Sequence, residues 1–168
     1  MNSYLFKQFA LAALIAATIF TASAALKIGD TLPDLNGFKL EGPLPKSLKG
    51  KVVILDFWAS WCGPCAESFP VMDELQQKYR DQGLVILAVS VDEKAGKMEG
   101  FLKRNPVSFA VVRDGDHKLV ANVTPQTMPT SFIIDRQGKV RFVHNGFHGS
   151  TTRKQYIEQI ESLLKATP

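Results

Sequence analysis

The stretch from Val52 to Cys65, Val-Val-Ile-Leu-Asp-Phe-Trp-Ala-Ser-Trp-Cys-Gly-Pro-Cys, decides the fold of this chain. Its first seven residues are almost all apolar and rich in β-branched side chains, which is typical of a strand covered on both faces. After a three-residue connection, a helix is predicted from Cys62 to about Asp81. The apolar residues of this helix recur at spacings of three and four: Phe69, Met72, Leu75 and Tyr79. The two cysteines therefore lie where a buried strand turns into a helix.

The rest of the sequence predicts an α/β domain in which strands alternate with helices. Glycine and proline punctuate residues 26–50, which we expect to form a loop-like extension with a short strand at Phe38–Leu40. The elements predicted after the cysteines are strands at 84–91 and 109–112, a helix at 92–104, a helical turn at 119–123, a hairpin of strands at 131–135 and 140–144, and an amphipathic helix at 151–165. Because a hairpin and a helix finish the chain, we expect a central mixed β-sheet flanked by helices.

Cys62 and Cys65 have the spacing of a reactive pair. Residues i and i+3 of a helix face the same side, close enough for a disulfide to form. At a helix N-terminus, unpaired backbone N–H groups and the helix dipole stabilise the thiolate, which is the attacking form in thiol–disulfide exchange. Pro64 fits the first turn, where its missing N–H is not needed, and Gly63 leaves room for a partner's backbone. Cys65, one turn deeper, is placed to attack the mixed disulfide and release the partner.

Two other interpretations of the pair have less support. A structural disulfide across four residues closes a very small loop and adds little stability. A zinc site needs two more ligands, and the sequence has no second cysteine pair. Its histidines are not spaced as a ligand pair: they are His117, His144 and His148. We therefore predict a redox-active Cys62–Cys65 disulfide, with no metal and no other cofactor.

Asp56 is a lone carboxylate inside the first predicted strand, six residues before Cys62. Burial there would raise its pKa by desolvation. The hypothesis is that Asp56 accepts the proton of Cys65, by way of water, when Cys65 attacks. The alternative is a solvated aspartate that faces the edge of the sheet.

Two further features lie near the cysteines in the sequence or in the predicted fold. Glu67 follows Cys65 by two residues, and near the pair it would oppose thiolate formation by like-charge repulsion. Its alternative is a solvated helix residue. Met128-Pro129 precedes an apolar strand, a position compatible with a cis peptide bond, although an ordinary trans proline loop also fits.

The first 24 residues have the three parts of a secretory signal. Lys7 is followed by an uncharged apolar run, and Ala22 and Ala24 suit a cleavage site before Ala25. An uncleaved membrane anchor is the alternative. We expect residues 1–24 to be a signal peptide or an anchor, and 25–168 to be one folded domain outside the cytoplasm, most readily in a bacterial periplasm. The formal net charge of +4 comes without a long basic run, which argues against nucleic-acid binding.

The motif from Asp56 to Cys65, with Pro70 later in the helix, resembles the thioredoxin active-site signature. The secretory start, Glu67 and the 37 residues from Asp92 to Pro129 resemble the extracytoplasmic TlpA/ResA type of thioredoxin-like proteins. The resemblance implies a thioredoxin fold with an N-terminal extension and a central strand–helix insertion. The chain departs from that branch at Asp56, where its members often have asparagine, and at Gly63-Pro64, the dipeptide of thioredoxin itself.

The resemblance also implies roles for individual residues. Cys62 would be the nucleophile and Cys65 the resolving thiol. Pro129 would be a cis-proline beside the pair, with the backbone of Met128 binding the partner's extended chain. Residues expected around the dithiol are Glu67 as an acidic residue that tunes it, Trp61, Gly63 and Pro64 at the substrate groove, and Gly146-Phe147 in a further lining loop.

The resulting functional hypothesis is a periplasmic thiol:disulfide oxidoreductase that reduces disulfides in exported proteins. The expected partners are cysteine-containing proteins, for example in cytochrome c maturation or metal-site assembly, and a membrane electron donor; we expect a monomer. A peroxiredoxin-type thiol peroxidase is one alternative, although Ala59 stands where a Thr-x-x-Cys pattern needs threonine. A copper-binding assembly chaperone that uses Cys62, Cys65 and Met128 is another.

Overall fold

The computed structural model describes residues 25–166, which fold around one five-stranded sheet. The predicted signal segment, residues 1–24, lies outside the described residues. The strands are β1 (Val52–Trp58), β2 (Leu84–Ser90), β3 (Ala110–Arg113), β4 (Thr130–Ile134) and β5 (Val140–Asn145). The helices are α1 (Gly63–Tyr79), α2 (Ala95–Arg104), α3 (Lys118–Val123) and α4 (Ser150–Lys165), with short 3-10 helices at Leu35–Gly37 and Arg80–Gln82. None of the described helices is long and apolar enough to cross a membrane.

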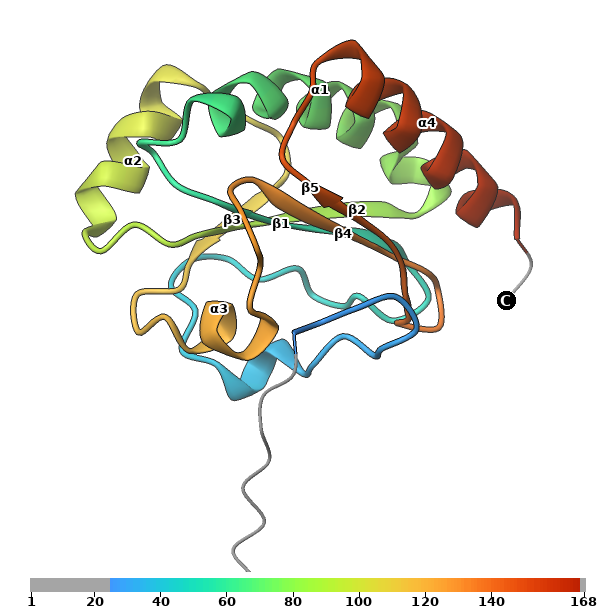
Figure 1. Ribbon diagram of the computed structural model, residues 1–168, viewed down its shortest axis with the longest axis horizontal. Coiled ribbons are helices and arrows are strands. Elements are labelled where there is room, and N and C mark those ends of the chain that lie inside the picture. The colour runs from blue at the N-terminus through green and yellow to red at the C-terminus, as the bar shows by residue number, and fades with distance from the viewer. Residues whose placement is uncertain (1–24, 167–168) are drawn as a thin grey trace, which may run out of the picture.

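The sheet is mixed, as the sequence predicts. Its order is β3-β2-β1-β4-β5, with β1, β2 and β3 parallel and with β4 antiparallel to both β1 and β5. Figure 1 shows α1, α2 and α4 over one face of the sheet, while α3 and the N-terminal extension cover the other. This is the α/β architecture of a central sheet between two layers.

The central strand β1 contributes side chains to the cores on both faces of the sheet. All seven of its residues are buried, and alternate side chains enter different cores because successive residues of a strand point to opposite faces. Ile54 and Trp58 belong to the core under α1 and α4, together with both cysteines. Leu55 and Phe57 belong to the core under α3 and the extension. The chain therefore leaves β1 buried on both faces and enters α1 at a fixed position.

An aromatic cluster ties α1 to β1 and α2. The ring centroid of Phe69 on α1 lies 4.5 Å from that of Trp58 on β1 and 5.2 Å from that of Phe101 on α2. Aromatic pairs at these separations stabilise beyond the area they bury. The cluster fixes the start of α1, which carries the cysteines, relative to the segment that follows β2.

The structure corrects two predicted elements. Phe38–Leu40 is not a strand, because the extension meets the sheet through isolated bridges, Thr31 with Lys139 and Glu41 with Arg113, and buries Leu35 against the sheet face between them. Helix α2 begins at Ala95 instead of 92, because the Asp92 carboxylate accepts hydrogen bonds outside the helix. The central strand–helix insertion is present as β3 and α3.

Candidate active site

The two cysteines form a disulfide at the start of α1. Their sulfur atoms are 2.09 Å apart and their Cα atoms 5.3 Å apart. Cys62 is the N-cap residue, and the backbone N–H of Cys65 donates a hydrogen bond of 3.2 Å to the Cys62 Sγ. An N–H group aimed at a sulfur at a helix N-terminus favours the thiolate once the disulfide is reduced. Cys65 is fully buried, whereas Cys62 retains 6% exposure, so a partner reaches Cys62 first.

The residues expected at the substrate groove surround this edge. Trp61 is 72% exposed, and Gly63 and Pro64 are exposed beside it. The Met128–Pro129 peptide bond is cis, and half-buried Met128 packs against the core cluster that contains both cysteines. The cis bond implied by the resemblance is present at Met128–Pro129. The substrate-binding roles of these residues stay predictions.

Asp56 is fully buried in β1, so the alternative of a solvated aspartate is wrong. Its side chain lies on the face of the sheet that carries α1 and α4, where Ser131 of β4 donates a hydrogen bond of 2.5 Å to Oδ1. The other oxygen, Oδ2, has no hydrogen-bond partner among the described residues. Burial raises the pKa of Asp56 from 3.8 to about 7, although the Ser131 hydrogen bond opposes the rise. The carboxyl therefore changes charge near neutral pH.

A tyrosine completes this buried polar group. The Tyr156 hydroxyl of α4 lies 2.7 Å from the Ser131 Oγ. Because the single hydroxyl hydrogen of Ser131 goes to Asp56, Tyr156 is the donor in this second bond when Asp56 is ionised. Burial and the charge of Asp56 both raise the pKa of Tyr156, so it stays protonated and remains a donor. Two hydroxyls in series thus stabilise the ionised form of Asp56.

The sequence predicts the helix that carries Tyr156 and the strand that carries Ser131, but it singles out neither residue. One signal was present: Ser131 is a hydroxyl residue in a predicted strand that is otherwise apolar up to Asp135. Its partner could not be found without the β1–β4 register, which sets Ser131 opposite Asp56.

Glu67 is exposed on α1, and its role as a tuning residue stays a prediction. The loop at Gly146-Phe147 is held against the cis-proline, since the Gly146 N–H donates a hydrogen bond of 2.7 Å to the Pro129 carbonyl. Phe147 is buried in the same core cluster as the cysteines. The structure thus places this loop next to Pro129 and leaves Glu67 facing solvent, and the lining role of the loop stays a prediction.

The chemistry available at this site is that of two sulfurs and one buried carboxyl group. Across residues 25–166, no three His, Cys, Asp or Glu side chains come close enough to hold a metal ion. A model of the Redoxin family matches residues 27–160. The chain belongs to the Redoxin family.

Relatives within this family share the site's chemistry. The chain is 36% identical over 154 residues to the thiol-disulfide oxidoreductase ResA of Geobacillus thermodenitrificans, covering 90% of this chain and 88% of that protein. It is 33% identical over 152 residues to ResA of Bacillus subtilis, covering 88% and 81% of the two chains. A crystal structure from Chlorobium tepidum, assigned as a thiol:disulfide interchange protein DsbE, is 40% identical, with a TM-score of 0.77 over 83% of this chain and 99% of that chain. The chain is therefore a thiol-disulfide oxidoreductase with a thioredoxin-like fold, and cysteine-containing proteins are its substrates.

The raised pKa of Asp56 predicts the effect of Asp56→Asn on stability. A carboxyl whose pKa is higher in the folded state than in the unfolded state loses stability as the pH rises from 3.8 through about 7. That rise corresponds to about 4 kcal/mol at 1.36 kcal/mol per pKa unit. We expect the free energy of unfolding of oxidised Asp56→Asn, relative to the native sequence, to gain about this amount between acidic pH and pH 8, in guanidinium titrations. A pH-independent difference would contradict the assignment.

The two hydroxyls predict how the pKa of Asp56 changes when either of them is removed. Ser131→Ala removes the hydrogen bond to the Asp56 Oδ1, so the pKa of Asp56 should rise above about 7. Tyr156→Phe should raise it less, because Ser131 keeps its bond to Asp56. The measurement is a carbon-13 NMR titration of the Asp56 carboxyl in the oxidised protein. A matched control is Ser162→Ala on the exposed side of α4, which should leave this titration unchanged.

Proposed function

We propose that the chain acts outside the cytoplasm as a reductase of disulfides in exported proteins, through the Cys62–Cys65 dithiol. The observation that carries the proposal is a cysteine pair at a helix N-terminus in which Cys62 retains 6% exposure and Cys65 is fully buried. A buried carboxyl with a pKa of about 7, that of Asp56, lies on the face of the sheet that carries α1. The signal-like residues 1–24 support export, and the sequence relationship to ResA supports the reaction class.

The first step is attack by the Cys62 thiolate on a substrate disulfide. A bond forms between the Cys62 Sγ and one substrate sulfur, and the substrate S–S bond breaks and releases the other sulfur as a thiolate. The N–H of Cys65 and the N-terminus of α1 stabilise the attacking anion. Exposed Trp61, Gly63 and Pro64 leave room for the partner's chain at this edge.

The second step is release by Cys65. Asp56, acting through water, accepts the thiol proton of Cys65 with the oxygen that has no other hydrogen-bond partner. The Cys65 thiolate attacks the Cys62 Sγ, and the second substrate sulfur departs as a thiolate and is protonated. The substrate gains two electrons and two protons, and the enzyme is left with the Cys62–Cys65 disulfide. A membrane dithiol donor returns these electrons and protons.

Two features favour reduction of the partner over its oxidation: the Gly63-Pro64 dipeptide and the proposed base, Asp56. Gly63-Pro64 is the pair found in thioredoxin, whose potential is near −270 mV, compared with about −120 mV for a strong oxidant. A base for Cys65 assists the step that completes reduction of a partner. A dithiol of this character in an oxidising compartment needs the membrane donor to stay reduced.

Loss of either cysteine should separate the two steps. Cys62→Ser should abolish insulin reduction with dithiothreitol as donor, because no attacking sulfur remains. Cys65→Ser should accumulate a mixed disulfide with the substrate, visible by mass spectrometry as one covalent adduct per chain. Reducing activity that survives Cys62→Ser would exclude the mechanism.

The base assigned to Cys65 predicts a pH profile. The rate of release from the mixed disulfide should rise as the pH increases through about 7, because Asp56 becomes ionised there. In Asp56→Asn this inflection should disappear, and the rate at pH 7 should fall about 10- to 100-fold, typical for loss of a general base. Rapid-quench kinetics of a preformed mixed disulfide measure this step, while the rate of the first attack serves as the internal control.

The direction of exchange predicts a redox potential. We expect equilibrium with glutathione or dithiothreitol buffers, read from thiol labelling, to give a value near −270 mV for the Cys62–Cys65 couple. A value above about −180 mV, the region of protein disulfide isomerase, would reverse the proposed direction while leaving the exchange chemistry intact.

A further inference from the structure

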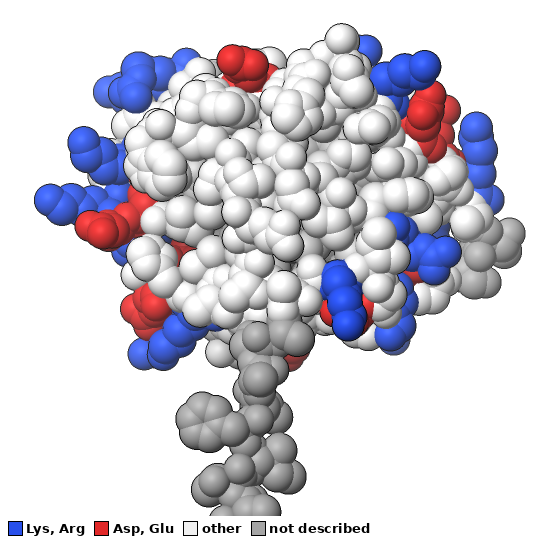
Figure 2. All heavy atoms as spheres, in the orientation of Figure 1, with Lys and Arg blue, Asp and Glu red and all other residues white. Residues whose placement is uncertain are grey.

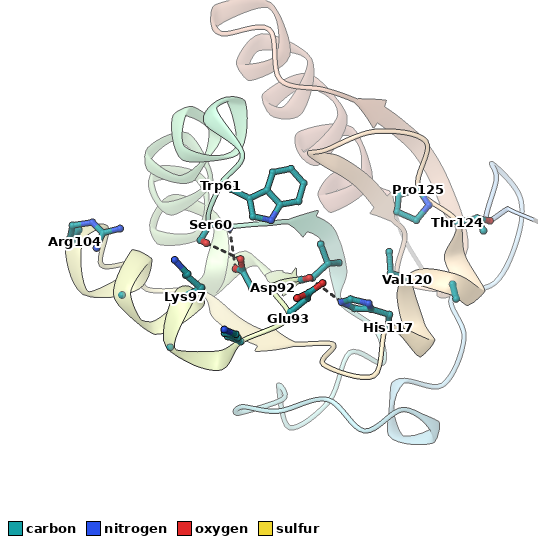
Figure 3. Close-up of a pocket in the computed structure, with 15 residues that line it drawn as sticks. Ser60, Trp61, Asp92, Glu93, Lys97, Arg104, His117, Val120, Thr124 and Pro125 are labelled. Carbon is teal, nitrogen blue, oxygen red and sulfur yellow. Dashed lines mark hydrogen bonds between the residues drawn. The ribbon is translucent and has the colours of Figure 1, made fainter.

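A hollow of about 1070 Å³ opens beside the reactive cysteine, between Trp61, α2 and α3 (Figure 3). Ser60 and Trp61, directly before Cys62, form one wall, and Thr124 and Pro125 line the side that leads along the chain toward Met128. Its volume is slightly above the range of about 300–1,000 Å³ that is usual for small-molecule pockets. We call it the α2 groove. It has room for a segment of polypeptide next to the dithiol.

Features that weaken the fold gather around this groove. Gly96 and Gly100 of α2 both line it, one turn apart, although glycine inside a helix is less stable than alanine. A Cβ added at Gly96 would meet nothing within 4 Å, and one at Gly100 would meet only the end of the Arg104 side chain, so packing does not require either glycine. Their absent side chains instead keep the α2 wall of the groove open.

The opposite wall carries backbone strain. His117 and Thr124, which bracket α3, are the non-glycine residues with positive φ in the described chain, at 54° and 47°. Both line the groove. Thr124 is the C-cap of α3, where a left-handed residue commonly ends a helix, and the His117 ring lies 3.0 Å from the Val91 carbonyl. These two residues fix the shape of the α3 wall.

The groove is rimmed by positive charge from α2. Lys94, Lys97 and Arg104 line it, all three are exposed, and none has an ion-pair partner within residues 25–166. In Figure 2, Lys and Arg side chains, with some acidic side chains among them, project from the edge that α2 forms in Figure 1, while the middle of the face is uncharged.

Two carboxylates also line the groove, and they are not equivalent. Asp92 is buried and accepts hydrogen bonds from the Ser60 backbone, the Ser60 hydroxyl and the Ser90 hydroxyl, at 3.0, 2.8 and 2.8 Å. Glu93 is exposed at the rim. With Asp92 fully engaged in holding Ser60, the exposed side chains present three cations against one anion.

We propose that the α2 groove binds an extended segment of the substrate protein that carries Asp or Glu side chains beside its disulfide. The inference rests on the reductase function proposed above and names its substrate class. Exposed Trp61 supplies an apolar anchor of the type that dominates protein interfaces. Lys97 and Arg104 attract the acidic side chains, which raises the rate of encounter and sets the partner's orientation toward Cys62.

The test uses two synthetic peptides, each with one internal disulfide, flanked on both sides by Glu-Asp-Glu or by Lys-Lys-Lys. The reduced protein is mixed with each peptide in single turnovers, and quenched samples are analysed by mass spectrometry. We expect the acidic peptide to react about 10-fold faster at low salt, with the advantage shrinking in 0.5 M NaCl, as steering by exposed charges requires. Equal rates for the two peptides would overturn the inference.

Charge variants locate the effect. Lys97→Glu/Arg104→Glu should abolish or invert the preference, and Lys97→Gln/Arg104→Gln should reduce it about 3-fold. The matched control Lys103→Glu/Lys154→Glu has the same change in net charge away from the groove and should keep the preference. A preference that survives in the first variant, or disappears equally in the control, would assign it to overall charge and contradict the proposal.

A steric variant checks the groove independently of charge. Gly100→Leu should raise the melting temperature and slow reduction of the acidic peptide about 5-fold, because leucine favours the helix but fills the groove. A purely structural glycine would give the opposite stability change. Hydroxyethyl disulfide, small and neutral, should be reduced by the Lys103→Glu/Lys154→Glu control at the rate of the native protein. If the native protein fails on that compound too, the reductase function itself is wrong; if only the peptide preference is absent, the groove proposal alone fails.

Discussion

The hydrogen bond from the Cys65 N–H to the Cys62 Sγ is the contact on which the site depends. It exists because β1 is buried on both faces and leaves the chain no freedom at the point where α1 begins. The N-cap position, usually filled by a serine, threonine or aspartate oxygen, is filled here by sulfur. The same geometry that starts the helix therefore also stabilises the attacking anion, and it buries Cys65 one turn further in.

The buried carboxyl of Asp56 is the group proposed to serve the second cysteine. An ionised aspartate in a strand core is unfavourable, and the structure offsets this only in part. Ser131 and Tyr156 stabilise the anion through one oxygen, while the other has no hydrogen-bond partner within residues 25–166. A fully satisfied carboxylate would have a low pKa and be a poor base, whereas an apolar pocket would keep it protonated. The intermediate arrangement, with a pKa of about 7, keeps the group able to accept a proton at neutral pH.

The parts of this arrangement that are local in sequence were predictable, and those that join distant segments were not. Apolar runs and helical periodicity predicted β1 and α1 closely, and the apolar neighbours of Asp56 predicted its burial. Ser131 lies 75 residues from Asp56 and 25 from Tyr156, so their bonds depend on strand register and helix docking. The start of α2 was misplaced for a similar reason, because the hydrogen bonds of Asp92 to Ser60 cross 32 residues. Phe38–Leu40 failed as a strand because tertiary packing outweighed its local pattern.

The long-range hydrogen bonds of Asp92 also join the segment that precedes Cys62 to the wall of the α2 groove. Asp92 holds the backbone and hydroxyl of Ser60, so the loop that carries Trp61 is fixed to the end of β2 where α2 departs. Arg113 of β3 donates to the carbonyls of Asp92 and Glu93 and pairs with Glu41 of the extension. Through Arg113, the extension and the insertion both hold the backbone at Asp92 and Glu93, which line the α2 groove. A substrate segment in that groove would meet a surface whose position relative to Cys62 is already set, and this preorganisation reduces the entropy lost on binding. Under the groove proposal, substitutions on α2 and α3 would change the substrate preference without altering Cys62, Cys65 or Asp56.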